Sequence, residues 1–391
     1  MKEKFLRELA DIQTGPFGSQ LHKEDYVADG TPIVTVEHLG NKMFSEQNLP
    51  RVSNTDKNRL KKYVLKQGDI VFSRVGSVDR CSYVDQKHDG WMFSGRCLRV
   101  RPTSEIDSEY LYYYFCLEET KQFVRNIAVG ATMPSINTKL LGEVVVTFPE
   151  LEQQKRISGI LSAIDSKIEV NQKINDNLYA QVKAIFSENF LDLDFLPDGW
   201  KTGNLLDIAD YSNGLAMQKY RPKDGETGLP VLKIKELRQG ICDASSELCS
   251  PSIKSEYIIH DGDIIFSWSG SLLVDIWCGG TCGLNQHLFK VTSNNYDKWF
   301  YYLWTAHHLD RFIAVAADKA TTMGHIKREE LEKVEVIIPS KCDYKRIGAL
   351  IKPLFDLIIS NRIEDRKLTA LRNTLLPKIM SGEIDVCDIQ L

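Results

Sequence analysis

The chain carries the same long helical pattern twice, 190 residues apart. The pattern covers about residues 151–189 and returns at 341–380, with apolar residues in alternating steps of three and four. This heptad spacing puts them on one helix face, which forms a seam for coiling around a partner helix. The seam positions are Ile157, Leu161, Ile164, Ile168, Asn171, Asn175 and Leu178, and then Ile347, Ile351, Leu354, Ile358, Asn361, Asp365 and Leu368.

Both seams are interrupted by polar residues at the same place. Asn171 and Asn175 break the first, and Asn361 and Asp365 break the second. A buried polar layer costs stability but fixes the register of paired helices. We therefore predict that the two helices pair with each other as an antiparallel coiled coil; the alternative is that each only covers its own globular domain. Pro353 should kink the second helix or delay its regular start.

The segments before each helix repeat as well. The sequence GDIVFS at 68–73 returns as GDIIFS at 262–267, where Gly-Asp makes a turn into a buried strand. A final strand ends at Pro149 in one copy and at Pro339 in the other. We predict an α+β protein with two similar mixed α/β domains and a pseudo-two-fold repeat. The predicted division is domain 1–149, helix 150–190, domain 191–340 and helix 341–391.

Signatures of catalysis are missing from the sequence. It has no phosphate-binding loop, no glycine fingerprint for a nucleotide or methyl-donor cofactor, and no Gly-x-Ser-x-Gly nucleophile elbow. The eight histidines lack metal-ligand spacing, and Asp69 and Asp263 are explained by the Gly-Asp turn. We therefore predict no catalytic residue, no metal site and no cofactor in this chain.

The sequence also predicts where the protein works. The nine cysteines are scattered without paired spacings, as expected for reduced thiols. The chain has no run of eighteen apolar residues, and its first residues do not resemble a signal peptide. We therefore predict a cytoplasmic protein.

The loops between the repeated strands differ between the copies in residues that can read base edges. Arg, Lys, Asn, Gln, Ser, Thr and His match the donors and acceptors in the DNA grooves, but such side chains can also be ordinary solvated loop residues. The aromatic stripes at 110–115 and 299–304 could stack on bases, although their helical spacing favours core packing. The candidate DNA-binding residues are Gln20, Arg74, Ser77, Arg80, Arg96, Thr132, Asn137 and Lys139 in the first copy, and Lys219, Trp268, Ser271, Asn285, Gln286, His287, Thr322, His325 and Lys327 in the second.

The order of these features resembles the specificity subunit of type I restriction–modification systems. The resemblance rests on the doubled domain–helix layout, the two Gly-Asp strand turns and the sequence PELEQ at 149–153, which opens the first helix. The second helix opens with PSKCDY at 339–344 and lacks the Glu-Gln pair.

The resemblance implies that each domain is a target recognition domain reading one half of an asymmetric, bipartite site in double-stranded DNA. The helices would set the gap between the two half-sites and dock two adenine methyltransferase subunits, which carry S-adenosylmethionine. Restriction subunits would then join the complex. The net charge of −4 is then tolerable, because partners can supply phosphate contacts. Open alternatives are an unrecognised nuclease or methyltransferase, a coiled-coil scaffold that does not bind DNA, and a recognition subunit of another defence system.

Overall fold

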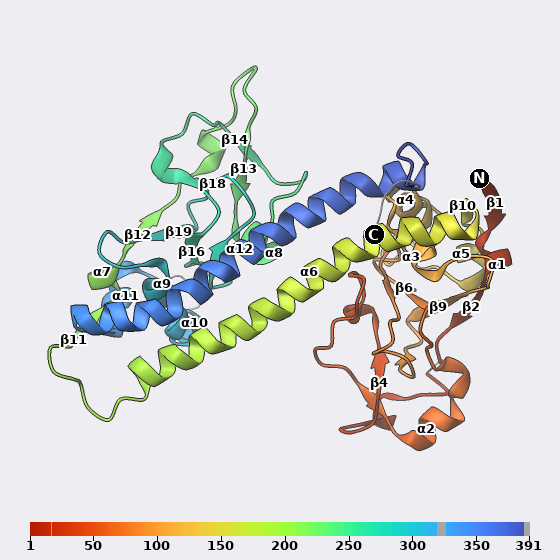
Figure 1. The fold of residues 1–391 in the computed structure, drawn as a ribbon, viewed down its shortest axis with the longest axis horizontal. Helices are drawn as coiled ribbons and strands as arrows, with labels where there is room; N and C mark the ends of the chain where they lie inside the picture. Colours follow the sequence, from red (N-terminus) through yellow and green to blue (C-terminus); the bar gives the residue numbers. More distant parts are fainter. Residues whose placement is uncertain (17, 319–325, 387–391) are drawn as a thin grey trace. The chain divides into compact units, whose positions relative to one another are not determined.

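The computed structural model describes residues 1–16, 18–318 and 326–386, which divide into two compact units. Unit 1 comprises the described residues of Met1–Ser166 and Thr369–Leu391, and unit 2 comprises those of Lys167–Leu368. The boundary falls within both long helices, α6 (Leu151–Phe186) and α12 (Lys341–Met380), which Figure 1 draws in yellow-green and blue. Each unit therefore contains a segment of each long helix, which the division predicted from the sequence did not anticipate.

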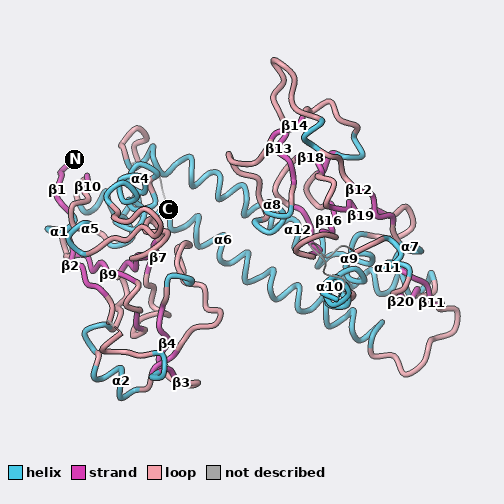
Figure 2. The backbone as a smooth tube through the Cα atoms, turned by 180° about the vertical axis from the view of Figure 1, so that it is seen from behind, coloured by secondary structure: helices cyan, strands magenta, loops and turns pink. Residues whose placement is uncertain are grey.

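Unit 1 contains three small sheets. Its first is an antiparallel sheet in the order β2 (Ala10–Thr14), β9 (Cys97–Pro102), β6 (Ile70–Ser73) and β7 (Cys81–Tyr83). The second has the order β3 (Tyr26–Val27), β5 (Arg51–Val52), β4 (Thr31–Val34) and β8 (Met92–Phe93), with β4 and β8 parallel. Figure 2 shows β3 and β4 apart from β2 and β9. The third pairs β1 (Lys2–Phe5) with β10 (Val145–Phe148).

Unit 2 repeats this arrangement. Its first sheet has the order β12 (Asp210–Asn213), β19 (Leu288–Thr292), β16 (Asp263–Ser267) and β17 (Leu273–Trp277). Its second has the order β14 (Leu248–Cys249), β13 (Leu229–Leu232), β18 (Cys282–Leu284) and β15 (Ile258–Ile259), with β13 and β18 parallel. Its third pairs β11 (Lys201–Asn204) with β20 (Glu335–Ile338).

Short helices complete both units, and four of the five occupy equivalent places; the second does not, because it follows β5 in unit 1 but precedes β14 in unit 2. Those of unit 1 are α1 (Leu6–Leu9), α2 (Asn54–Arg59), α3 (Ser108–Cys116), α4 (Glu118–Ile127) and α5 (Thr138–Leu141). Those of unit 2 are α7 (Leu205–Ile208), α8 (Ile234–Gln239), α9 (Lys298–His307), α10 (Leu309–Asp318) and α11 (Arg328–Glu332).

The Gly-Asp turns have the same geometry in both units. Gly68 has a φ of 88° and Gly262 a φ of 83°, a backbone conformation that favours glycine. The Asp69 carboxylate accepts from the backbone N–H of Lys66 at 2.8 Å, and Asp263 accepts from that of His260 at 2.9 Å. Each aspartate thus closes its own turn, as the sequence predicted.

The second sheets differ at their edges. In unit 2, β15 pairs antiparallel with β18. At the equivalent place in unit 1, a single bridge joins Val64 to Met92. Unit 1 instead carries β3 beside β5.

The aromatic helices α3 and α9 are core elements. Tyr110, Tyr113 and Phe115 are buried in unit 1, and Trp299, Phe300 and Trp304 are buried in unit 2. Figure 1 shows α9 beside the first half of α12. The rings of Trp299 in α9 and Tyr344 in α12 stack with their centroids 5.4 Å apart. The prediction that these stripes pack in the core rather than stack on bases is confirmed.

Each unit buries its helix segments in the same core as its sheet. In unit 1, Ile157 and Leu161 of α6 join Leu376, Ile379 and Met380 of α12. In unit 2, Val182 and Phe186 of α6 lie in one core with Ile347, Ile351 and Phe355 of α12. The helices are therefore part of both cores and do not merely connect them.

The predicted antiparallel pairing of the seams is confirmed within unit 2. The Asn171 amide donates to Asp365 at 2.8 Å and to Glu364 at 2.7 Å, and the Asn361 amide donates to Asn175 at 2.9 Å. From position 171 to position 175 of α6, the partner in α12 changes from 365 to 361, so the two helices run antiparallel. The two polar breaks thus pair with each other in one layer, in which Asn171 and Asn361 are buried and Asn175 and Asp365 half-buried.

Of the two effects expected of Pro353, the delayed start of the second helix is wrong, and the kink stays a prediction. Helix α12 begins at Lys341 and continues through this proline to Met380. Pro353 is exposed, so water can bind the carbonyl of the preceding turn that loses its N–H partner. The first helix instead changes character, because α6 ends at Phe186 and continues as a π-helical turn, Ser187–Leu191.

Candidate nucleic-acid interface

Three loops of unit 1 lie side by side beyond the end of β6. The backbone N–H of Arg74 donates to the carbonyl of Arg96 at 2.8 Å, and Ile136 donates to the carbonyl of Arg74 at 2.9 Å. The backbone of Gly76 donates to Pro134 at 2.8 Å. Main-chain bonds therefore fix the loops after β6, before β9 and before α5 as one surface.

This surface brings together several of the predicted residues. Ser77, Arg96 and Thr132 are exposed on the three loops. Arg74 is half-buried beneath them, and its guanidinium donates to the carbonyl of Gly95 at 3.2 Å. Lys139 is exposed on the following helix, α5. Arginine and hydroxyl side chains are suited to base edges and phosphates.

Three other candidates of unit 1 make local structural bonds. The Gln20 side-chain carbonyl accepts from the Tyr63 hydroxyl at 2.6 Å. Arg80 donates to the carbonyl of Leu39, and Asn137 caps α5 by accepting from the backbone of Leu140 at 2.9 Å. Base reading by these residues stays a prediction, and it would have to share or replace these bonds.

Unit 2 uses the same loop frame with different side chains. The backbone of Ile326 donates to the carbonyl of Trp268 at 3.0 Å, as Ile136 does to Arg74 in unit 1. Trp268 is half-buried, with its ring 5.6 Å from that of Phe289 and 6.1 Å from that of His287. An indole packed in this way is suited to shaping the loop.

The loop 285–287, here called the reading loop, is ordered by its own hydrogen bonds. Asn285 is buried and accepts from the backbone N–H of His287 at 3.2 Å. One ring nitrogen of His287 lies 3.2 Å from the Ser269 hydroxyl, and the other lies 3.3 Å from the Gln286 amide nitrogen. This chain of polar groups holds the Gln286 amide in place, which is what direct base recognition requires.

A pocket of about 480 Å³ opens beside the reading loop. Besides the loop itself, its lining includes Gln218, Arg221, Lys233, Lys235 and Glu247. None of these was predicted, although Lys219 beside them was. Aligning the two copies places Lys235 where the first copy has Glu37, and this change of charge was the available signal.

The remaining candidates of unit 2 are scattered. Lys219 is exposed, Ser271 is half-buried, and Lys327 is exposed at the start of α11. Thr322 and His325 lie outside the described residues.

The seam residues predicted for partner docking face inward. All fourteen are buried or half-buried, among them Ile157, Leu161, Asn171 and Ile347. Docking of a separate protein through these side chains stays a prediction, and atoms already packed in a core are poorly placed for it.

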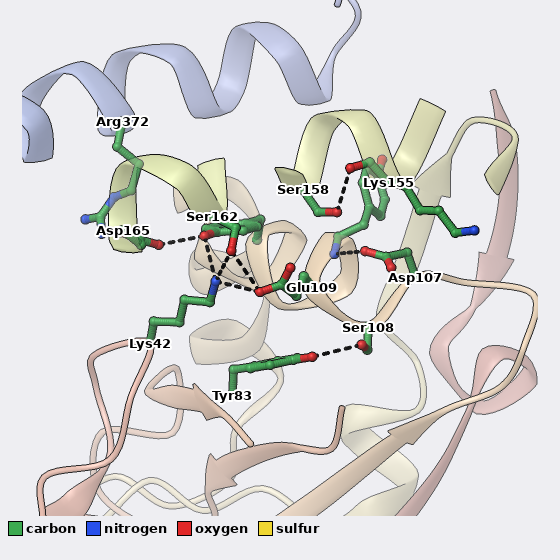
Figure 3. Close-up of polar contacts among 12 residues, drawn as sticks. Lys42, Tyr83, Asp107, Ser108, Glu109, Lys155, Ser158, Ser162, Asp165 and Arg372 are labelled. Atoms are coloured by element: carbon green, nitrogen blue, oxygen red, sulfur yellow. Dashed lines mark hydrogen bonds and ion pairs between the residues drawn. The ribbon is translucent and has the colours of Figure 1, made fainter. Parts of the chain in front are cut away.

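A polar network fixes the globular part of unit 1 to its helices (Figure 3). The Lys42 ammonium donates to Glu109 at 2.7 Å, to Ser162 at 2.8 Å and to Tyr113 at 3.2 Å. The Tyr113 hydroxyl donates to Asp165 at 2.7 Å. Although a lysine beside a serine can be a catalytic pair, an ammonium that donates three hydrogen bonds has no lone pair to accept a proton.

Two further observations concern metals and membranes. Within residues 1–16, 18–318 and 326–386, no group of three or more His, Cys, Asp and Glu side chains is arranged to hold a metal ion. Among the helices in this part of the chain, none is long and apolar enough to cross a membrane.

Comparison with known proteins links this architecture to one family. The family model described as "Type I restriction modification DNA specificity domain" matches residues 1–180 and 197–369. A type I restriction enzyme specificity subunit of Methanocaldococcus jannaschii is 28% identical over 312 residues, covering 73% of this chain and 71% of the relative. One from Haemophilus influenzae is 20% identical over 403 residues, covering 83% and 88%.

A solved structure shares the fold. The S subunit of a type I restriction–modification system from M. genitalium aligns with a TM-score of 0.58 at 16% identity. The alignment covers 97% of this chain and 95% of that one.

Proposed function

Because the chain belongs to the family of type I restriction–modification specificity subunits, we propose that it selects the DNA sequence on which such a complex acts. The globular part of each unit reads one half of an asymmetric bipartite site, and the chain itself catalyses no reaction. The observation that carries this proposal is the doubled loop frame. Arg74 and Arg96 in unit 1 are replaced by Trp268 and His287 in unit 2, so one frame presents two different sets of hydrogen-bonding groups.

The long helices serve two further roles in this proposal. They set the spacing of the half-sites, and they dock two adenine methyltransferase subunits that carry S-adenosylmethionine, through which restriction subunits join. Since the seam is buried, docking would use apolar side chains that face water. In unit 2 these are Leu350 and Leu357 of α12, 52% and 44% exposed, and Val170 and Ile174 of α6, 49% and 41% exposed. Such side chains on helices are suited to packing against a partner's helices.

The charge of the chain supports a shared DNA interface. A net charge of −4 gives little sequence-independent attraction to phosphates. Methyltransferase subunits that close around the DNA would supply the missing positive surface, while this chain supplies base contacts worth about 1–3 kcal/mol each.

Methylome sequencing tests the proposal directly. The chain is expressed with its neighbouring methyltransferase in cells without other adenine methylation. We expect methyladenine at a split, asymmetric motif. Exchanging residues 1–149 for those of a related chain should change one half of the motif and leave the other intact. Absence of new methylation, with the methyltransferase shown to be active on another specificity subunit, would refute the proposal.

A further inference from the structure

The pocket beside the reading loop combines three cations with one carboxylate. Arg221, Lys233 and Lys235 come from separate positions before and after β13, and Glu247 precedes β14. The carboxylate lies between two of the cations, with Glu247 Oε1 2.5 Å from Lys233 Nζ and Oε2 3.2 Å from Arg221 Nη1. Lys235 is held separately, by the Ser245 hydroxyl at 2.9 Å and Asp243 at 3.8 Å.

The arrangement of Glu247 resembles that of a bound phosphate. One oxygen meets an ammonium and the other meets a guanidinium, the pairing that these cations also make with phosphate oxygens. The hydrogen bond from Lys233 holds the pKa of Glu247 below its usual range, so the group is an anion at neutral pH. The side chain is 41% exposed, so another anion can reach the same place.

The pocket is also continuous with the groups suited to reading bases. Asn285, Gln286 and His287 line it together with Arg221 and Lys233. A backbone phosphate in the pocket would therefore belong to nucleotides next to the base that the reading loop contacts, as phosphate contacts generally fix the register of base contacts.

We propose that this pocket binds one phosphodiester group of the DNA backbone, and that Glu247 occupies its place until the phosphate displaces it. The inference rests on the proposed role in DNA recognition. The displaced carboxylate turns to solvent, and the phosphate takes over the bonds from Arg221 and Lys233.

Glu247 is thereby a specificity-determining residue that weakens binding to unrelated DNA. On a matching sequence, the base contacts hold the backbone close enough to complete the exchange. On other sequences the carboxylate stays, so these two cations add little to the sequence-independent attraction. Low affinity for unrelated DNA matters because such sites greatly outnumber the target.

The test measures binding of the methyltransferase complex to two duplexes over a range of salt concentrations. One duplex carries the motif found by methylome sequencing, and the other a scrambled sequence. For Glu247→Gln, we expect about threefold tighter binding to the scrambled duplex, and a plot of log affinity against log salt about one unit steeper, because one phosphate contact is added. Binding to the motif should keep its slope, because that contact already exists in the wild type.

A matched control is Glu188→Gln, which removes the same charge from an exposed position in the turn after α6. It should leave both slopes unchanged. Equal slopes for Glu247→Gln and wild type on scrambled DNA, or weaker binding by the variant, would overturn the inference while leaving the proposed function intact. A wild-type complex that does not distinguish the two duplexes would overturn the proposed function and this inference with it.

Discussion

Units 1 and 2 attach the same kind of fold to their helix segments by different chemistry. In unit 1, the half-buried Lys42 bonds to Glu109 and to Ser162 of α6, and the Tyr113 hydroxyl donates to Asp165 of α6 at 2.7 Å. In unit 2, two bidentate ion pairs join the globular part to α12. Arg362 meets Asp275 with both contacts at 2.8 Å, and Arg366 meets Asp261 with both at 2.8 Å.

The difference shows which parts of the repeat can change independently. The strand turns and aromatic helices are alike in both units because a buried core tolerates little change in shape. The polar attachments are local, and any arrangement that satisfies its own donors and acceptors serves equally well. Tyr113 and Tyr302 illustrate this, since they occupy equivalent places but bond to Asp165 and to Tyr179.

Breaking an attachment of unit 2 should have the largest effect. Arg362→Ala leaves Asp275 without its bidentate partner at a site where both side chains are less than a third exposed, at 29% and 27%. We expect a loss of about 2 kcal/mol, below the value for a fully buried pair. Urea unfolding gives the total, and hydrogen exchange should place the loss in β16 and β17. The double variant Arg362→Met/Asp275→Leu should lose less, and an equal loss would contradict the ion-pair explanation.

The attachment of unit 1 should be somewhat less sensitive. Lys42→Met removes three hydrogen bonds but leaves Glu109, 29% exposed, within reach of water. We expect a loss of about 1.5 kcal/mol, detected by urea unfolding and by faster exchange in α3. The control is Lys87→Met, whose side chain is 63% exposed and should change stability by about 0.5 kcal/mol or less. Similar effects of the two variants would show that the network carries no stability.

The polar layer between the helices of unit 2 should show a smaller effect that depends on pH. Asn171→Ala removes the amide that donates to Glu364 and Asp365. The hydrogen bond from Asn171 lowers the pKa of Glu364, whereas burial raises the pKa of Asp365. We expect a loss of about 1 kcal/mol at pH 7. Without the donor both pKa values rise, so protonation at lower pH should reduce the deficit. A deficit that does not change between pH 7 and pH 4 would argue against this assignment.

The smallest expected difference at pH 7 comes from His308, which lies between α9 and α10 where unit 1 has Leu117. Burial lowers the pKa of His308 to about 4, from about 6.5 in an unfolded chain. The unfolded state therefore binds a proton first as the pH falls from 6.5 toward 4, and unit 2 loses stability over this range. In His308→Gln the decline should be shallower. Parallel pH profiles for the two proteins would exclude the contribution.

The features that could be predicted from the sequence are those carried by periodicity or repetition. The two seams predicted that the helices pair with each other, because both are interrupted by polar residues at the same place. The short edge strands β3 and β15 could not be predicted, because each has two residues and so carries no alternating pattern. The contribution of both long helices to each core could not be predicted either, since heptad spacing does not indicate which globular part a helix packs against.

The residues of the candidate site also fall into those that the repeat revealed and those that it did not. Loop positions such as Arg96 and Gln286 were found by comparing the copies. The cations Arg221 and Lys233 were missed, because the pocket joins residues that are far apart in the sequence. Local bonds, such as that of Gln20 to Tyr63, were not foreseeable either, since a loop glutamine gives no sign of its partner.

The division of the chain into units has a consequence for its synthesis on the ribosome. Unit 2 is one continuous stretch, Lys167–Leu368, whereas unit 1 needs Thr369 and the residues after it. Although most of unit 1 is translated first, its core must wait for Leu376, Ile379 and Met380. Unit 2 can therefore finish folding first, while the earlier half waits incomplete with apolar surface that a chaperone, or a partner already bound, could shield.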